Sequence, residues 1–208
     1  MNTTKIGWIG LGKMGVPMVQ NLLKAGYDVS VFNRSKEVLE LFKNQDVRIA
    51  NHPKELIETC DVVILMVADD KATEAIFSGE NGLLSSSATH KTIINMSTVS
   101  AEISQKMADQ LNESGNEYLD APVSGSLKQA TEGSLVIMAG GKENVFETVK
   151  PIFSCLGKLA LRVGDVGAGN SAKLAINALL SFHALGLAEA VVFAKDKGIE
   201  TSTLLELI

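Results

Sequence analysis

The chain has 208 residues, 46% of them apolar, and a formal net charge of −5 at pH 7. This length suits one domain of ordinary size and part of a second. An acidic chain lacks the basic face that nucleic-acid binding requires, which excludes a nucleic-acid partner. Cys60 and Cys155 fit no zinc or C-x-x-C spacing, and the three histidines are scattered. We therefore expect reduced thiols, no metal site and a cytoplasmic location, with no room for a signal peptide before the first strand.

A glycine-rich turn separates an apolar run, 6–9, from a helical pattern that ends near Gly26. Its glycines have the spacing G-x-G-x-x-G, and the flanking strand and helix are the context that a dinucleotide-binding turn requires. The helix N-terminus offers unpaired N–H groups and a partial positive charge to a pyrophosphate. The simpler alternative is a turn in an unrelated α/β domain. We predict cofactor contacts from Gly10, Leu11, Gly12, Lys13, Met14 and Gly15.

Asn33, Arg34 and Ser35 follow the second predicted strand, 29–32, and precede a predicted helix over 36–44. In a dinucleotide-binding fold the end of this strand meets the adenosine ribose, where an acid selects NAD. The chain has no acid here, whereas the Arg34 guanidinium can bind a 2′-phosphate with Ser35 as a second donor. Ser35 can also cap the following helix. The pattern favours NADP as the cofactor, with NAD possible.

Strands and helices alternate along the first three quarters of the chain, which predicts an α/β fold with a Rossmann-type, doubly wound sheet. Ligands of such sheets bind beyond the carboxyl ends of the strands. These ends include Val67 and Thr98, which we expect at the cofactor, although Thr98 could equally cap the helix that begins near residue 101. The further predicted strands are 47–50, 61–67, 92–96, 117–121, 134–139 and 158–163, and the further predicted helices are 53–58, 69–77, 102–111 and 143–153.

Ser124, Gly125 and Ser126 follow the strand predicted over 117–121. We expect them to begin a short helix, so that their N–H groups and hydroxyls could bind an anion. A plain turn before that helix is the alternative.

The chain changes character near residue 166, and a long helical pattern occupies 170–195. We assign residues 1–165 to the Rossmann domain and 166–208 to the start of an all-helical domain. Its apolar stretch is long enough to span a bilayer, but its polar residues favour a buried helix of a soluble protein without a membrane partner. Lys173, Asn177 and Ser181 are spaced four apart and form one polar stripe. Lys173 could donate a proton to a carbonyl or extend to solvent.

Six motifs resemble those of the β-hydroxyacid dehydrogenase family, which includes 3-hydroxyisobutyrate dehydrogenases, tartronate semialdehyde reductases and glyoxylate/succinic semialdehyde reductases. They are GLGKMGVPM (10–18), VFNRS (31–35), STVS (97–100), DAPVSGS (120–126), EGSLVIMAGG (132–141) and GAGNSAKLAIN (167–177). The resemblance implies hydride transfer between NADP(H) and a small β-hydroxyacid or the corresponding semialdehyde or 2-oxoacid. It implies Lys173 as the catalytic acid/base, and Ser124, Gly125 and Asn177 as substrate contacts. It also implies cofactor contacts from the glycine turn and Thr98, and a homodimer or homotetramer.

The chain departs from this family at its C-terminal end. Family members continue for roughly another half-domain of helices, whereas this chain stops at Ile208 within an apolar helix. We expect an incomplete copy that lacks the part closing the active site and building the dimer. Two other functions stay open: an imine reductase, although these usually lack a lysine at the position of Lys173, and an inactive cofactor-binding scaffold.

Overall fold

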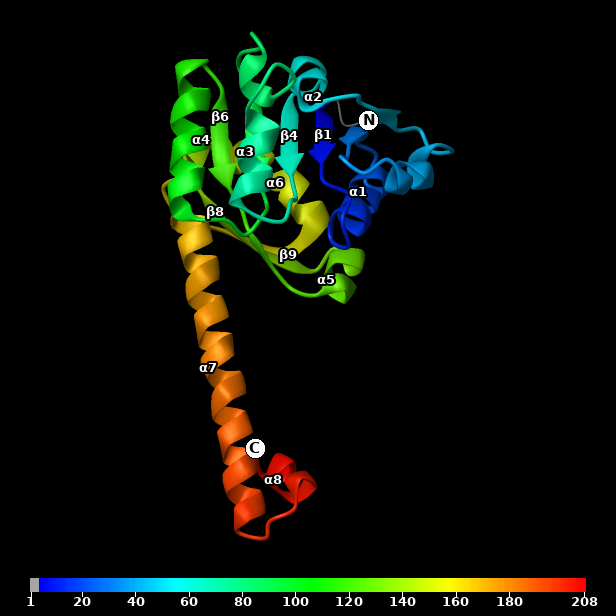
Figure 1. Cartoon of the computed structure of the whole chain (residues 1–208). Coiled ribbons are helices and arrows are strands. Elements are labelled where there is room, and N and C mark those ends of the chain that lie inside the picture. The colour runs from blue at the N-terminus through cyan, green and yellow to red at the C-terminus, as the bar shows by residue number, and fades with distance from the viewer. Residues whose placement is uncertain (1–3) are drawn as a thin grey trace. The chain divides into compact units, whose positions relative to one another are not determined.

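The computed structural model describes residues 4–208, which form two compact units divided between Lys173 and Leu174. The first unit holds a sheet of nine strands within the described part of the chain (Figure 1). They are β1 (Lys5–Ile9), β2 (Asp28–Phe32), β3 (Arg48–Ile49), β4 (Val62–Leu65), β5 (Thr92–Asn95), β6 (Glu117–Asp120), β7 (Val123–Ser124), β8 (Leu135–Gly140) and β9 (Gly157–Gly164).

Helices and 3₁₀ segments connect these strands. The helices are α1 (Gly15–Lys24), α2 (Pro53–Thr59), α3 (Asp70–Phe77), α4 (Ala101–Glu113), α5 (Leu127–Glu132), α6 (Glu143–Leu156), α7 (Ala168–Asp196) and α8 (Thr201–Leu207), with 3₁₀ segments η1 (Glu37–Phe42) and η2 (Leu83–Ser85). The division between the two units falls inside α7.

The sheet is parallel across β3-β2-β1-β4-β5-β6, and this strand order is the one that binds dinucleotides. The predicted doubly wound sheet is therefore confirmed. A reversal follows that the sequence pattern did not predict, because β8 runs antiparallel to β6 and β7 and parallel to β9. Because β1, β4, β5 and β6 run parallel to one another, their carboxyl ends meet at one edge of the sheet.

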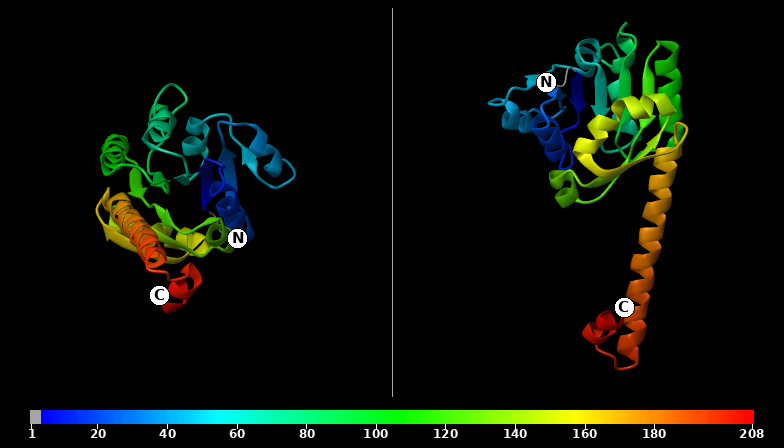
Figure 2. Two further views of the ribbon diagram at one scale, coloured as in Figure 1. Left: turned by 60° about the horizontal axis from the view of Figure 1, so that its bottom comes forward. Right: turned by 180° about the vertical axis from the view of Figure 1, so that it is seen from behind.

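Two hydrophobic layers hold helices on opposite faces of the sheet. Met18 and Leu22 of α1 share one layer with Phe146 and Phe153 of α6, and α6 lies in front of the sheet in the right-hand view of Figure 2. The other layer contains residues of α2, α3 and α4, among them Phe77. Each such buried side chain stabilises the fold by about 1.5–3 kcal/mol. The central strands contribute to both layers, which explains why β4 reads as an unbroken apolar run.

Two proposed helix caps are wrong. The segment after Ser35 is the 3₁₀ segment η1 rather than a helix over 36–44, and Lys36 precedes it without a side-chain cap. Helix α4 is capped by Ser100, whose Oγ accepts from the backbone N–H of Ile103, and not by Thr98. Ser100 has the advantage because Asp70 holds both its amide and its hydroxyl. Ser35 and Thr98 thus keep only their proposed cofactor roles.

The short helix predicted at residues 124–126 begins later. Ser124 lies in strand β7, paired with Val136, and α5 starts at Leu127. Ser126 forms a capping box with Gln129, because each residue satisfies a backbone N–H of the other. The strand pairing of Ser124 with β8 replaces the local helix start that its serine-rich context suggested.

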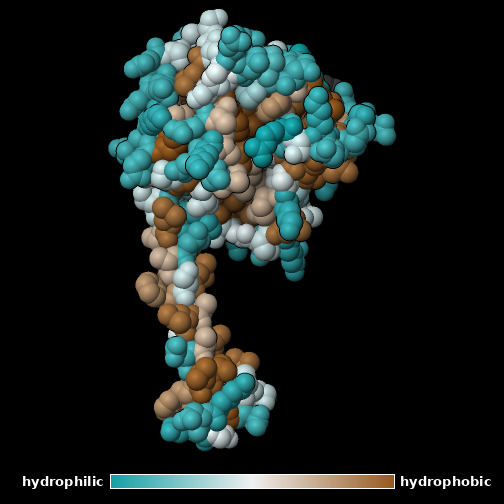
Figure 3. Space-filling model, viewed as in Figure 1, coloured by the Kyte–Doolittle hydropathy of each residue, from teal (hydrophilic) through white to brown (hydrophobic). Residues whose placement is uncertain are grey.

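The second unit contains the rest of α7 and the helix α8, separated by Gly198 in a left-handed conformation. Helix α7 is long and apolar enough to cross a membrane by length and composition, and its most apolar window is exposed. The prediction that this helix is buried is therefore wrong within this chain, since the short α8 offers little surface to cover it. Its brown surface in Figure 3 shows the exposed apolar side chains, which include Leu179, Leu180, Phe182, Leu185, Val192 and Phe193.

Candidate active site

The glycine turn between β1 and α1 forms an open backbone cradle. Gly10 has φ +102°, and a Cβ on it would lie 2.2 Å from the carbonyl oxygen of Met66. A Cβ on Gly15 would lie 2.0 Å from the carbonyl oxygen of Gly10. Gly12, in contrast, has no atom within 4 Å of the position of its absent Cβ. Two glycines thus allow close packing and the third leaves the backbone open, as a pyrophosphate site requires.

Backbone donors at the start of α1 are available to an anion. Within residues 4–208, the amides of Gly12, Lys13 and Met14 have no hydrogen-bond acceptor. The amide of Leu11 instead donates to Oδ1 of Asn33 over 2.8 Å, and the Leu11 side chain is buried in the core. The unpaired amides and the helix dipole together favour a phosphate group at this turn.

A cavity of about 590 Å³ adjoins the turn. Its lining brings together most of the predicted cofactor residues: Gly10, Gly12, Lys13, Met14, Gly15, Asn33, Arg34, Ser35 and Val67. Ala68, just before α3, and Ala72 and Ala75 within α3 also line the cavity. Arg34 is exposed and has no ion pair or hydrogen bond in the described part of the chain. Asn33 is already engaged, because its Nδ2 donates to the carbonyl of Ser35 while its Oδ1 holds Leu11. These residues fit a dinucleotide, with Arg34 free to bind phosphate.

The ends of β4 and β5 are joined beside this cavity. The amide of Val67 donates to Oγ of Ser97 over 2.8 Å, and the amide of Ser97 donates to Oδ1 of Asn95. Thr98 follows directly, is exposed, and makes no side-chain hydrogen bond to any residue from 4 to 208. Thr98 does not line the cavity, but it follows Ser97, which is bonded to the lining residue Val67.

Ser124 and Gly125 lie on the reversal between β6 and β8. Gly125 has φ +145°, and a Cβ there would approach Cδ2 of Leu135 to 2.8 Å, so only glycine fits. The half-buried Ser124 hydroxyl has no hydrogen-bond partner among the described residues. It can therefore accept or donate to a ligand without breaking an internal bond.

Lys173 lies close to the start of α7. A hydrogen bond connects this start to the segment that follows β5. Oδ1 of Asn170 accepts from the backbone N–H of Val99 over 2.9 Å. Lys173 is three residues further on, and residues at this spacing share one side of a helix. Burial lowers the pKa of the half-buried Lys173, which has no carboxylate partner within residues 4–208. Asn177 belongs to the second unit, and its proposed contact with substrate stays a prediction.

Comparisons with known proteins agree with this geometry. Residues 5–167 match the family described as the NAD binding domain of 6-phosphogluconate dehydrogenase. The chain is 40% identical over 196 residues to 2-hydroxy-3-oxopropionate reductase of Escherichia coli (strain K12). This match covers 94% of the chain and 67% of that protein. It is 32% identical over 208 residues to chloroplastic glyoxylate/succinic semialdehyde reductase 2 of Arabidopsis thaliana. This match covers 100% of the chain and 58% of that protein.

A solved structure is also similar. Mycobacterium tuberculosis 3-hydroxyisobutyrate dehydrogenase with L-serine matches with a TM-score of 0.92 at 28% identity, over 100% of this chain and 70% of that chain. The chain belongs to the β-hydroxyacid dehydrogenase family. The expected family and its NAD-binding domain are thus confirmed. This β-hydroxyacid dehydrogenase chain spans only 58–67% of the length of the two enzymes from Arabidopsis and Escherichia coli.

Two buried residues of this β-hydroxyacid dehydrogenase chain were not singled out from sequence. Asp120 ends β6, and Asn170 lies in the first turn of α7. Both are fully buried and bonded to each other, although 50 positions separate them. The available signal was an acid at the end of an apolar strand, because a charge there must find partners.

Proposed function

We propose that the chain is an NADP(H)-dependent oxidoreductase of the hydroxyacid dehydrogenase type, acting on small semialdehydes or 2-oxoacids that carry a carboxylate and on the corresponding β-hydroxyacids. One observation carries the proposal. The chain combines an open dinucleotide cradle with three polar side chains that have no internal partners within residues 4–208, namely Thr98, Ser124 and Lys173. Unpaired polar groups in a fold that binds dinucleotides are candidates for ligand contacts.

The residues divide the work between cofactor and substrate. The amides of Gly12, Lys13 and Met14 bind the pyrophosphate, and Arg34 binds the 2′-phosphate through charge-assisted hydrogen bonds. Ser124, with the open backbone at Gly125, binds the substrate carboxylate. When bound, the nicotinamide supplies the hydride that reduces the carbonyl carbon.

Lys173 supplies the proton. Its ammonium group donates to the carbonyl oxygen as the carbon accepts hydride, so a carbonyl becomes a hydroxyl and the lysine becomes neutral. Partial burial favours the neutral amine and thereby strengthens the ammonium as an acid. In the direction of oxidation the neutral amine accepts the same proton. Asn177, one turn further along α7, orients the lysine or the substrate in this proposal.

The nearest competing activity is imine reduction, because imine reductases share this fold. The presence of Lys173 favours carbonyl reduction, since an imine reductase usually lacks this lysine. An inactive cofactor-binding scaffold would need the unpaired amides and Arg34, but it would need neither Ser124 nor Lys173. We further propose a homodimer or homotetramer, because α7 exposes an apolar surface that a second copy could cover. The proposed location is the cytoplasm.

A substrate panel tests the proposal. The protein is mixed with NADPH or NADH and with short semialdehydes, the matching aldehydes without a carboxylate, or cyclic imines, and cofactor absorbance is followed. We expect turnover of the carboxylate-bearing aldehydes with NADPH. Equal turnover of the matched aldehydes would refute carboxylate recognition, turnover of imines alone would favour the alternative, and NADPH binding without any turnover would favour the scaffold.

A further inference from the structure

One buried carboxylate joins three segments of the candidate site. Asp120 is fully buried at the end of β6. Its Oδ1 accepts from the amide of Gly167 over 2.8 Å, and its Oδ2 accepts from the amide of Asn170 over 2.7 Å. Gly167 directly precedes α7 and Asn170 lies in its first turn, so the carboxylate caps the helix that carries Lys173. Strand β7, which contains Ser124, begins three residues after Asp120.

Asn170 extends this connection to the third segment. Its Oδ1 accepts from the amide of Val99, and its Nδ2 donates to Oγ of Ser104 over 3.2 Å and to Oδ2 of Asp120 over 3.4 Å. Val99 adjoins Thr98, the predicted contact at the nicotinamide end. The segments with Thr98, Ser124 and Lys173 therefore converge on one pair of side chains.

Two glycines bring the backbone close enough for these bonds. A Cβ on Gly140 would lie 2.3 Å from Oδ1 of Asp120. A Cβ on Gly169 would lie 2.4 Å from the carbonyl oxygen of Met138 and 2.7 Å from that of Asp120. The first turn of α7 is thus fitted tightly between β6 and β8, and it has little freedom to shift.

Capping a helix does not require an acidic side chain at the position of Asp120. Burial raises the pKa of Asp120, while the hydrogen bonds from Asn170 and Gly167 oppose that rise. Asp120 forms no ion pair with any residue from 4 to 208. A neutral Ser, Thr or Asn can cap a helix without the desolvation cost of a buried charge. A carboxylate can instead accept several N–H bonds at once and hold them short.

We propose that Asp120 is a positioning residue that fixes Lys173 relative to the Thr98 and Ser124 segments. The inference rests on the proposed function, because position matters only if Lys173 donates a proton. A misplacement of about 1 Å between reacting groups can cost about 10²-fold in rate. Loss of the carboxylate should therefore lower kcat while leaving cofactor binding intact, since the glycine turn and Arg34 do not contact Asp120.

Asp120→Asn tests this at constant size. One oxygen becomes an NH₂ group that faces a backbone donor, so one of the two capping bonds is lost. We expect kcat to fall about 10- to 100-fold with the Kd of NADPH unchanged. Asp165→Asn is the matched control, because it removes an exposed carboxylate near the start of α7, and kcat should stay unchanged. An equal loss of NADPH binding in Asp120→Asn would indicate a merely structural role and overturn the proposal.

A second readout separates this inference from the proposed function. The pKa of Lys173 can be measured from the pH dependence of its labelling by an amine reagent, with mass spectrometry, well below the melting temperature. We expect this pKa to rise toward the ordinary lysine value in Asp120→Asn, because a loosened first turn exposes the ammonium. This result would support positioning even in a protein without turnover. Unchanged kcat and unchanged Lys173 pKa would overturn it.

The variant Asn170→Ala tests the positioning role if Asp120→Asn fails to fold. It keeps both backbone bonds to Asp120 and removes the side-chain bonds of Asn170 to Val99, Ser104 and Asp120. A drop in kcat or a rise in the pKa of Lys173, with the Kd of NADPH unchanged, supports the proposal. Wild-type values for both would overturn it.

Discussion

At the scale of single residues, the site is distinguished by side chains that the fold leaves unpaired. Arg34 and Lys173 have no carboxylate partners within residues 4–208, although the chain carries 24 acidic residues. Several other cations in the first unit do have such partners, as Arg48 has in Glu55. Cations without internal partners beside a cavity or a helix start are available to anionic or carbonyl ligands, which makes them the first residues to test.

Arg34→Ala should raise the KM for NADPH and change that for NADH little. The guanidinium is the predicted partner of the 2′-phosphate, which only NADPH carries. Steady-state kinetics with both cofactors measure the effect, and Lys36→Ala is the control, because Lys36 is an exposed cation outside the cavity lining. A wild type that prefers NADH, or a variant that still prefers NADPH, would contradict this role.

Lys173→Ala should lower kcat by about 10²-fold or more, the usual scale for losing a general acid, with the Kd of NADPH nearly unchanged. Lys173→Arg should also be slow, because a guanidinium keeps its proton near neutral pH. For reduction, the wild-type kcat should fall as pH rises through the lowered pKa of Lys173, since only the ammonium donates. Full activity of Lys173→Arg would leave Lys173 only an electrostatic role.

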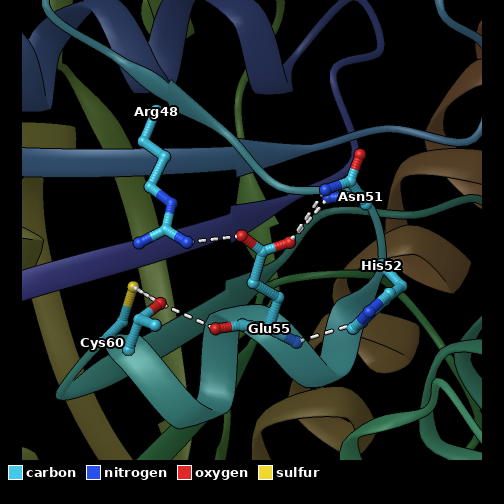
Figure 4. A network of polar contacts seen from close by, with 6 residues as sticks. Arg48, Asn51, His52, Glu55 and Cys60 are labelled. Carbon is cyan, nitrogen blue, oxygen red and sulfur yellow. Dashed lines mark hydrogen bonds and ion pairs between the residues drawn. The ribbon is translucent and has the colours of Figure 1, made fainter.

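At the scale of elements, the start of α2 shows how side chains set a helix boundary. In Figure 4, the Glu55 carboxylate faces Arg48 and Asn51, while Nδ1 of His52 accepts from the amide of Glu55. The amide of Asn51 donates to Oε2 of Glu55 over 2.9 Å. This bond is the main cause of the lowered pKa of Glu55, opposed by burial and assisted by Arg48. The helix that supports β1 and η2 is thereby fixed at its first turn.

Glu55→Gln should reduce the free energy of unfolding by about 1 kcal/mol at neutral pH. The folded-state pKa of Glu55 lies below its unfolded value, so its stabilisation is present above the unfolded pKa and is lost as pH falls through the folded pKa. Urea titrations at neutral and acidic pH should therefore show a difference from wild type that shrinks in acid. Glu58→Gln, at an exposed position of α2, is the control. A difference that persists in acid would show that the Glu55 charge is not responsible.

At the scale of the whole molecule, the two units differ in how they satisfy their apolar residues. The first unit buries them in two layers around a sheet. The second unit exposes them along α7, where Phe182 is 70% and Leu180 is 55% accessible. An exposed apolar surface of this kind marks an interaction site. A second copy of the chain would cover it through a self-complementary contact.

The protein should therefore self-associate, and Phe182→Asp should shift it toward monomer. A charge at the centre of an apolar contact would remain desolvated and unpaired. Size-exclusion chromatography with light scattering measures the mass, and Ser181→Asp is the control because Ser181 belongs to the polar stripe. A monodisperse wild-type monomer would refute self-association, and capture by lipid vesicles in place of self-association would identify a membrane as the occupant.

The sequence by itself determined the features that depend on neighbours in the chain. The glycine spacing with its flanking strand and helix identified the cofactor turn, and the alternation of strands and helices identified the doubly wound sheet. Arg34, at the end of β2, could be placed because a strand end has a fixed location in this fold. The position of Lys173 near the start of a long helix was equally readable, since helical periodicity is local.

Only the tertiary structure decided features that depend on distant partners. Ser100 caps α4 in place of the expected Thr98, and Asp70, thirty positions away, holds its amide and hydroxyl. The reversal at β8 arises from pairing between strands, which no local pattern encodes. Asp120 and Asn170 acquired their importance from bonds that close a long loop of chain. Local preferences leave such choices nearly equal in free energy, so contacts between distant residues determine which one the folded chain adopts.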